Sequence, residues 1–201
     1  MPQLTIIRHG QSLYNLENRF TGNVDVPLTP LGKEEAKQAG DKLKAFHFDS
    51  AFVSKLIRAQ ETLKIILEEL NQPNLPISIS EALDERMYGE LQGLNKSDTI
   101  RKFGTKQVEL WRRSYDVRPP GGESLKDTYE RVIPYYQTQV EPELRKDKHI
   151  LIVAHGNSLR ALIMYLENIS PEAIVEINIA TGVPRVYSMD SGLRILELRD
   201  L

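Results

Sequence analysis

The sequence predicts an α/β fold, a three-layer α/β/α sandwich with a mostly parallel central sheet. Short apolar segments alternate with longer segments in which apolar residues recur at helical spacing, and this order is typical of a sheet covered by helices on both faces. Ile150–Ala154 is apolar throughout, as a strand buried on both faces requires. No repeat, low-complexity tract or linker divides the chain, so residues 1–201 are expected to form one domain.

The expected strands are short apolar or β-branched runs bounded by polar or turn-forming residues. They lie, in chain order, at Gln3–Arg8, 49–54 ("DSAFVS"), 76–80 ("PISIS") and Ile150–Ala154, and a hairpin with "MDSG" (189–192) as its turn closes the chain. Because helical segments separate the first four strands, these are expected to pair in parallel.

The expected helices lie at 29–46, Lys55–Leu70, Ser97–Arg113, Glu123–Leu144 and Asn157–Leu166. The first begins with Thr29 as N-cap and Pro30 at the first helical position, where proline is favoured. The second and the last carry their apolar residues on one face. Gly104 is expected to break the third helix, and Pro134 to kink the fourth.

Two of the four histidines, His9 and His155, directly follow apolar strands and directly precede glycines. Ligands of open α/β sheets bind outside the carboxyl ends of the strands. If the two strands are neighbours, the histidines therefore face each other across one pocket. Either His-Gly pair alone could equally be a turn in which the histidine satisfies a backbone group, but two pairs in equivalent positions favour a functional site.

Cationic residues accompany the histidines. Arg8 precedes His9, and Arg58 lies early in an expected helix, off its apolar face. The others are Arg86 and Lys96, on either side of "YGELQGLN", and Arg112 and Arg113, after Trp111. Each alone could be a solvated surface charge. If they converge on the two histidines, they form a cationic cup suited to phosphate, to which arginine offers paired hydrogen bonds.

Composition and missing motifs exclude several classes. The chain has no cysteine, no HExxH motif and no third ligand placed with the histidines, so no metal is expected. The glycine-rich phosphate loops of nucleotide-binding proteins are absent too. A net charge of -2 argues against a general affinity for nucleic acid. No apolar run approaches the ~20 residues of a membrane span and no secretory signal is visible, so a cytoplasmic protein is expected, in line with the absence of cysteine.

Five motifs carry a resemblance to a known family. They are "RHGQSLYN", "ENRFTG", "LDERMYGELQGLNK", "WRRSYDVRPP" and "AHGNSLRA". In this order and spacing they resemble the cofactor-dependent phosphoglycerate mutases of the histidine phosphatase superfamily, nearly end to end. "RHG" alone is shared by many phosphatases, whereas "YGELQGLNK" followed by "WRRSYD" is much more specific to the mutases. The segment "GGESLKD", directly after Pro119-Pro120, resembles the short form of the family.

The resemblance implies a role for each matching residue. His9 would be the nucleophile that becomes phosphohistidine, and Glu85 the proton donor. Arg8, Arg58 and His155 would surround the transferring phosphoryl group. Substrate-binding positions would be Arg8, Ser12, Asn15, Thr21, Gly22, Arg58, Glu85, Arg86, Tyr88, Lys96, Arg112, Arg113, Gly156 and Asn157. The family usually has tryptophan where Tyr14 and Asn23 stand, and often histidine or tyrosine at Met87, which bears on substrate fit but not on the chemistry.

The implied reaction interconverts 3-phosphoglycerate and 2-phosphoglycerate, in glycolysis and gluconeogenesis, with 2,3-bisphosphoglycerate as primer and without a metal. The implied partners are small phosphoglycerates, and a homo-oligomer is possible. For this chemistry the attacking nitrogen of His9 must be unprotonated, and the neighbouring cations Arg8 and Arg58 lower its pKa. The other ring nitrogen is expected to donate to a backbone carbonyl. Glu85 must be protonated to act as the acid, and the charges of the bound substrate would raise its pKa.

Two alternatives stand beside the mutase. A plain phosphatase would keep the histidines, Arg8, Arg58 and Glu85 but would lack the matches in "GLNK" and "WRRSYD". A catalytically silent binding protein on the same fold would be expected to have lost a histidine or the acid, and neither is missing.

Overall fold

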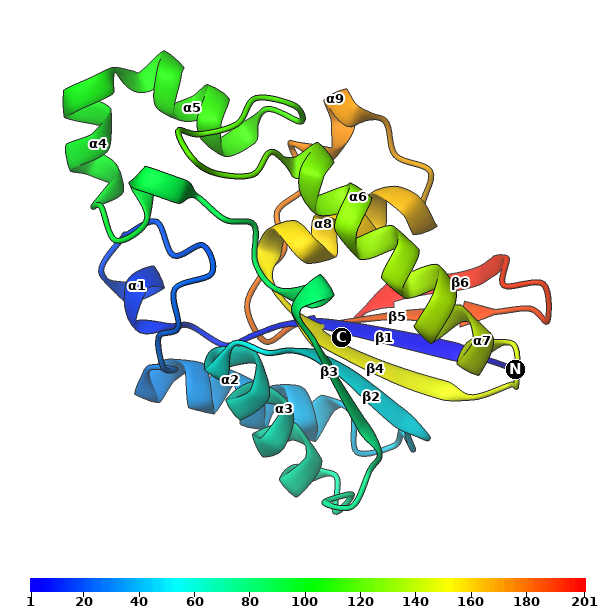
Figure 1. Ribbon diagram of the computed structural model, residues 1–201. Helices are drawn as coiled ribbons and strands as arrows, with labels where there is room; N and C mark the ends of the chain where they lie inside the picture. Colours follow the sequence, from blue (N-terminus) through cyan, green and yellow to red (C-terminus); the bar gives the residue numbers. More distant parts are fainter.

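A six-stranded sheet runs through the computed structural model, which describes residues 1–201 (Figure 1). Its strands are β1 (Gln3–Arg8), β2 (Ser50–Ser54), β3 (Ile77–Ser80), β4 (His149–Ala154), β5 (Pro184–Met189) and β6 (Ile195–Asp200). Their order across the sheet is β3-β2-β4-β1-β5-β6. The first four in this order pair in parallel, and the pairs β1–β5 and β5–β6 are antiparallel. The expected mostly parallel sheet and the closing hairpin are therefore confirmed, with the turn beginning at Asp190 because Met189 still belongs to β5.

Helices cover both faces of the sheet, which makes the predicted three layers (Figure 1). The helices are α1 (Leu13–Leu16), α2 (Pro30–Lys42), α3 (Ile57–Glu69), α4 (Lys96–Phe103), α5 (Thr105–Arg113), α6 (Leu125–Tyr135), α7 (Glu141–Leu144), α8 (Gly156–Leu166) and α9 (Pro171–Ile174). Successive residues of β4 point to opposite faces: Leu151 and Val153 join the core under α2 and α3, and Ile152 joins the core under α6 and α8. A strand between two cores must be apolar at every position, which explains its composition.

The fourth expected helix differs most from the prediction. It starts at Leu125, because Ser124 caps it, and at Tyr136 it widens into a π-helical turn that ends at Val140, before α7. Pro134 lies just before this turn and has no N–H to give to the carbonyl one turn earlier, so the hydrogen-bond register changes there. The expected break at Gly104 is confirmed, with a φ of 83° that favours glycine.

The carboxyl edge of the sheet is where β1 and β4 end together. Arg8 pairs in register with Ala154, so His9 and His155 leave the sheet side by side. The loop after β1 touches the start of α2 backbone to backbone: a Cβ on Gly10 would lie 2.1 Å from the carbonyl oxygen of Gly32. Only glycine permits this approach, which fixes where the chain leaves β1.

A separate excursion, α4 and α5, rises from the sheet between β3 and α6 (Figure 1). It has its own small core of Phe20, Leu91, Val108 and Trp111. No helix of the chain combines the length and the apolar character needed to cross a bilayer.

Candidate active site

The two histidines that end β1 and β4 lie against each other. Their ring centroids are 4.9 Å apart, and the residues are 2% and 0% exposed. The Nδ1 of His9 lies 2.6 Å from the carbonyl oxygen of Gly10, and its Nε2 lies 3.3 Å from the Nε of Arg58. A carbonyl can only accept and a guanidinium can only donate, so His9 carries its proton on Nδ1 and leaves the Nε2 lone pair available.

Burial keeps the His9 ring neutral. The pKa of His9 is lowered well below 6.5, first because the ring is removed from water and then because Arg58 and Arg8 are close. The sequence predicted that the arginines lower this pKa. The larger cause, burial of the ring where β1 ends, is visible only in the structure. A neutral imidazole with an unprotonated Nε2 has the protonation state that a nitrogen nucleophile needs.

Arg58, from the first turn of α3, is held in place on two sides. Besides His9, its guanidinium donates to the carbonyls of Val24 and Gly22, both at 2.8 Å. The side chain is only 1% exposed, and burial lowers its pKa to about 10. This charge therefore belongs to the buried site and is not a solvated helix charge.

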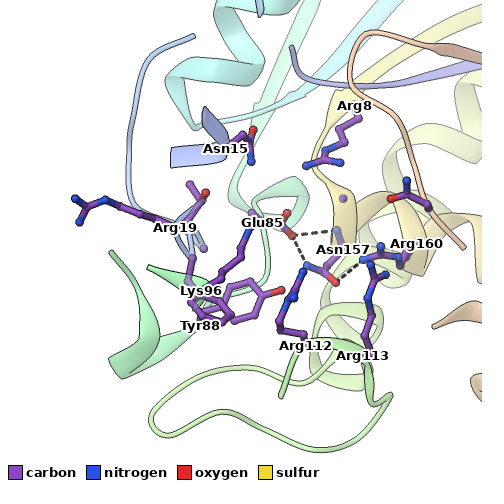
Figure 2. Close-up of a pocket in the computed structure, with 15 residues that line it drawn as sticks. Arg8, Asn15, Arg19, Glu85, Tyr88, Lys96, Arg112, Arg113, Asn157 and Arg160 are labelled. Carbon is purple, nitrogen blue, oxygen red and sulfur yellow. Dashed lines mark hydrogen bonds between the residues drawn. The ribbon is translucent and has the colours of Figure 1, made fainter. Parts of the chain in front are cut away.

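Glu85 faces the same site from the segment after β3. Its Oε1 accepts hydrogen bonds from the backbone N–H of Arg86 at 2.8 Å and from the backbone and side-chain N–H groups of Asn157, both at 3.0 Å (Figure 2). Three donors fix the carboxylate by one oxygen. The other oxygen, Oε2, lies 3.6 Å from the point where a Cβ of Gly156 would be. Oε2 is thus the atom left to exchange a proton.

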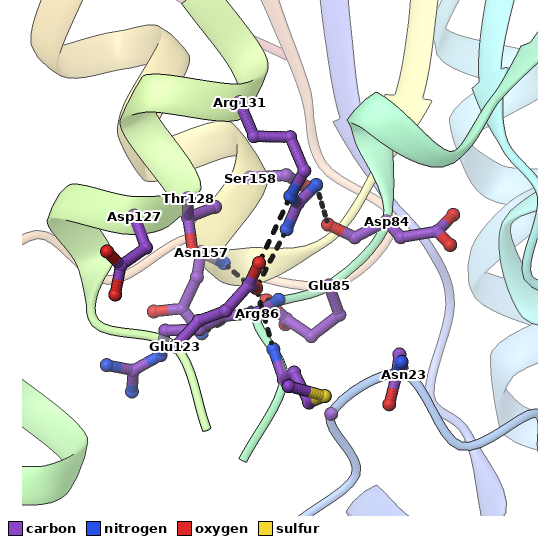
Figure 3. A network of polar contacts seen from close by, with 12 residues as sticks. Asn23, Asp84, Glu85, Arg86, Glu123, Asp127, Thr128, Arg131, Asn157 and Ser158 are labelled. Carbon is purple, nitrogen blue, oxygen red and sulfur yellow. Dashed lines mark hydrogen bonds and ion pairs between the residues drawn. The ribbon is translucent and has the colours of Figure 1, made fainter. Parts of the chain in front are cut away.

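An ion pair on the far side fastens the segment that bears Glu85 (Figure 3). Arg131, on α6, pairs with Glu123 at 3.1 Å and donates to the backbone carbonyls of Ala82 and Asp84. Glu123 in turn accepts from the backbone N–H of Met87 at 3.0 Å. The backbone is therefore held on both sides of Glu85, which limits its freedom before any ligand binds.

Arg8, Glu85 and Asn157 line a cavity of about 250 Å³ (Figure 2). Its charged lining is one carboxylate, Glu85, and six cations: Arg8, Arg19, Lys96, Arg112, Arg113 and Arg160. The pKa of Lys96 is lowered by burial and then by Arg112. Cations that depress one another's pKa values are unbalanced, so the cavity favours an anion with more than one charge. No group of three or more His, Asp or Glu side chains is placed to hold a metal ion.

Most of the predicted binding residues line this cavity, and three do not. Arg58 lies buried beside His9, and neither it nor the two histidines is part of the lining. The lining includes Arg8, Asn15, Thr21, Gly22, Glu85, Tyr88, Lys96, Arg112, Arg113, Gly156 and Asn157. Ser12 instead caps α1 and bonds to Asn15. Arg86 is fully buried behind the wall, where its guanidinium donates to the hydroxyl of Tyr88 and lies 4.5 Å from that ring. These two side chains support lining residues rather than face the cavity.

Four lining residues were missed: Arg19, Phe20, Arg160 and Asn178. Arg19 and Arg160 stand within the quoted motifs "ENRFTG" and "AHGNSLRA", so the motifs held the signal. Arg160 donates to the Oδ1 of Asn157 at 3.1 Å, and thereby braces the side chain that holds Glu85 (Figure 2). Burial lowers its pKa to about 10. Nothing in the sequence marked Asn178.

Comparison with known proteins gives a consistent result. The model of the histidine phosphatase superfamily (branch 1) matches residues 4–200. A 2,3-bisphosphoglycerate-dependent phosphoglycerate mutase of Cytophaga hutchinsonii is 57% identical over 193 residues, which cover 96% of this chain and 90% of that protein. A phosphoglycerate mutase of Schizosaccharomyces pombe is 54% identical over 189 residues, covering 93% and 90%.

Solved structures with the same fold are more distant in sequence. A mycobacterial glucosyl-3-phosphoglycerate phosphatase superimposes with a TM-score of 0.83 at 27% identity, covering 100% of this chain and 96% of its own. An α-ribazole-5'-P phosphatase from Escherichia coli, described as putative, gives 0.83 at 25% identity, covering 100% and 95%. The fold is thus common to these phosphatases, and the higher sequence identities are to mutases.

Proposed function

The chain belongs to the histidine phosphatase superfamily, and from that premise we propose that it is a 2,3-bisphosphoglycerate-dependent phosphoglycerate mutase. One observation carries this proposal: the cavity has cations at both ends. Arg8 lies at one end, next to the buried His9, and Lys96, Arg112 and Arg113 lie at the other (Figure 2). A phosphoglycerate carries a phosphate and a carboxylate, and the two ends fit these two anions.

In the proposed reaction, Nε2 of His9 attacks the phosphorus of a phosphate ester in line with the leaving oxygen. The P–O bond breaks as the N–P bond forms, and Glu85 gives its proton from Oε2 to the leaving alkoxide. With 2,3-bisphosphoglycerate as the first donor, the phosphorylated enzyme then passes its phosphoryl group to the free hydroxyl of 3-phosphoglycerate, and Glu85 takes up the proton of that hydroxyl. The 2,3-bisphosphoglycerate so formed turns in the cavity, and His9 takes its other phosphoryl group, which releases 2-phosphoglycerate and restores the phosphorylated enzyme. Arg8 and Arg58 balance the charge of the phosphoryl oxygens during both transfers.

The far wall of the cavity, formed by Lys96, Arg112 and Arg113, distinguishes this proposal from a plain phosphatase. A phosphatase needs water at the phosphohistidine, whereas a mutase needs to hold the glycerate while it turns. Lys96 is the first residue of α4, the end of a helix at which the dipole disfavours a cation. The ammonium group of Lys96 is half-buried among other cations and opposes the helix dipole, so it does not stabilise the fold. Binding of an anionic ligand explains its position better.

The proposal also covers the primer, the absence of a metal and the place where the protein acts. We propose 2,3-bisphosphoglycerate as the primer, no metal in the chemistry, and residues 1–201 as one catalytic unit acting in the cytoplasm in glycolysis and gluconeogenesis. The absence of cysteine fits a reducing compartment.

The test is a coupled assay of purified protein freed of bound phosphate. On 3-phosphoglycerate alone it should show a lag, which trace 2,3-bisphosphoglycerate abolishes, and isomerisation should greatly outpace release of inorganic phosphate. Exhaustive chelation should leave the rate unchanged. Phosphate release that equals isomerisation in the primed enzyme would assign the chain to the phosphatases instead.

A further inference from the structure

Behind the second histidine, His155, lies a short chain of polar groups that the proposed reaction does not use. The Nε2 of His155 lies 2.7 Å from the Oγ of Ser54, at the end of β2. That Oγ lies 2.7 Å from the Oδ1 of Asp84, which also accepts from the backbone N–H of Lys55 at 3.0 Å. All three side chains are buried.

Counting protons gives the direction of each hydrogen bond. Ionised Asp84 can only accept, so the single proton of Ser54 goes to Asp84. The Ser54 oxygen then accepts twice, from the backbone N–H of Leu56 at 3.1 Å and from His155. His155 must therefore carry a proton on Nε2. The hydroxyl makes all three of its possible hydrogen bonds, and no other arrangement satisfies an ionised Asp84.

The other ring nitrogen of His155 is left without a partner. Nδ1 is buried and makes no hydrogen bond, while the ring lies 4.9 Å from that of His9. In the neutral ring with Nε2 protonated, Nδ1 holds a lone pair. A lone pair repels phosphoryl oxygens, so a phosphoryl group on His9 can be met there only if Nδ1 gains a proton.

The charged groups around His155 oppose that proton. Burial comes first in lowering its pKa, followed by Arg58 on α3, then His9 and Arg8 at the end of β1, and Arg131 on α6. The carboxylate of Asp84 is the one negative charge in hydrogen-bonded contact, through Ser54. Figure 3 shows it turned away from Arg131, which takes the backbone carbonyl of Asp84 instead.

We propose that Ser54 and Asp84 are positioning residues that hold His155 with Nε2 protonated and so direct Nδ1 to take up a proton when a phosphoryl group binds at His9. The proton comes from solvent or from a P–OH group of the bound anion, and it returns when the anion leaves. Asp84 stabilises the resulting imidazolium through the hydroxyl of Ser54. This inference rests on the proposed phosphoryl site at His9, but not on whether the chain is a mutase.

Nitrogen NMR of the protein labelled with ¹⁵N-histidine tests the proposal directly, with inorganic phosphate as the probe. In the free protein, His155 should be the neutral tautomer with Nε2 protonated. Saturating phosphate should convert it to the form with both nitrogens protonated. In Ser54→Ala the free ring should lose its single tautomer.

Asp84→Asn separates the charge from the hydrogen bond, because the amide oxygen still accepts from Ser54. The tautomer of the free ring should be kept. In the phosphate complex, the pKa at which Nδ1 of His155 takes up its proton should fall by about one unit. The alkaline limb of turnover should shift by the same amount. The matched controls are Ser50→Ala, at the other end of β2, and Asp49→Asn, whose carboxylate accepts from the backbone of His149; neither should change the His155 signals.

Different outcomes overturn different claims. If phosphate shifts the His9 signals but Nδ1 of His155 stays unprotonated, the inference fails and the proposed function stands. If phosphate shifts neither histidine, the phosphoryl site at His9, and with it the proposed function, is wrong. Should Ser54→Ala not fold, the free-protein tautomer and Asp84→Asn still decide the question. A free ring protonated on Nδ1, or an unshifted pH dependence in Asp84→Asn, contradicts the proposal.

Discussion

The floor of the site and its far wall are built in different ways. On the floor, His9 and Arg58 are nearly buried, and short hydrogen bonds to backbone carbonyls fix the proton of one and the orientation of the other. On the wall, Arg113 is exposed and makes one long hydrogen bond, 3.4 Å to Val175, and the pKa of Lys96 is lowered first by burial and then by its cationic neighbours. The side chains of the floor thus have hydrogen-bond partners within the protein, whereas the positive charges of the wall need an anionic ligand to balance them.

The difference separates chemistry from recognition. The floor comes from the ends of β1 and β4 and the first turn of α3, which the sheet holds rigidly. The wall comes from α4 and α5, an excursion with its own small core. Substitutions in the floor should therefore reduce every reaction of the enzyme, whereas substitutions in the wall should reduce only reactions of substrates that reach it.

The strongest test of the floor is removal of the nucleophile. His9→Ala should abolish the acid-labile, base-stable label left by 2,3-bisphosphoglycerate and lower kcat by at least about 10⁴-fold, since a covalent route is lost. His47→Ala, at an exposed histidine, is the control and should label normally. Equal labelling of His9→Ala and the parent would assign the phosphoryl group to another residue.

The acid comes next in size. Glu85→Gln keeps the oxygen that Asn157 and Arg86 contact but cannot supply a proton, so kcat should fall about 10²–10⁴-fold with KM changed much less. Glu90→Gln, at an exposed carboxylate in the same segment, should leave the kinetics unchanged. A Glu85→Gln enzyme with nearly normal kcat would return Glu85 to the status of a surface carboxylate.

The wall should show a smaller and selective effect. Arg112→Gln should raise KM for 3-phosphoglycerate about 10- to 100-fold, the worth of one charge-assisted hydrogen bond, and leave hydrolysis of p-nitrophenyl phosphate almost unchanged. Lys102→Gln, at the exposed end of α4, is the matched control. If both substrates suffer equally, the wall supports the fold instead of the substrate, and the contrast between floor and wall disappears.

The smallest effect concerns stability against pH. His9 and His155 have folded-state pKa values well below 6.5, so the unfolded chain binds protons first as the pH falls. Their contribution to stability is complete above about pH 6.5 and is lost below it, by about 2 kcal/mol in all between pH 6.5 and 5.5. Denaturant unfolding at the two pH values measures this loss. His155→Asn should lose about half of the pH dependence, and His47→Asn none; an equal loss in all three proteins would show that other groups cause it.

Sequence patterns were most informative where one physical cause acts alone. The apolar run Ile150–Ala154 in β4 is explained by burial on both faces. Gly104, with its positive φ, interrupts a helix through its own backbone conformation, whatever the surrounding fold. The π-helical turn after Pro134 depends on which register the packing of Tyr136 and Val140 favours, and no local pattern contains that information.

The site divides in the same way. The resemblance in motifs found most of the lining residues, but it could not separate Arg112, which faces the cavity, from Arg86, which lies behind it. Both are arginines within conspicuous motifs, and only the packing of Tyr88 and Trp111 tells them apart. No role was predicted for Ser54 or Asp84, because a serine and an aspartate 30 residues apart carry no joint signal until the sheet brings them together.

The position of β1 in the sheet has a consequence for how the protein is made. β1 is the first strand to leave the ribosome, yet both of its neighbours, β4 and β5, belong to the last third of the chain. For most of synthesis β1 therefore has two open edges and His9 has no companion. Pairing between strands far apart in the sequence slows folding and prolongs the exposure of an apolar strand with unpaired edges. The nascent chain is thus expected to be catalytically inert and in need of protection until nearly its full length has emerged, when fold and activity arise together.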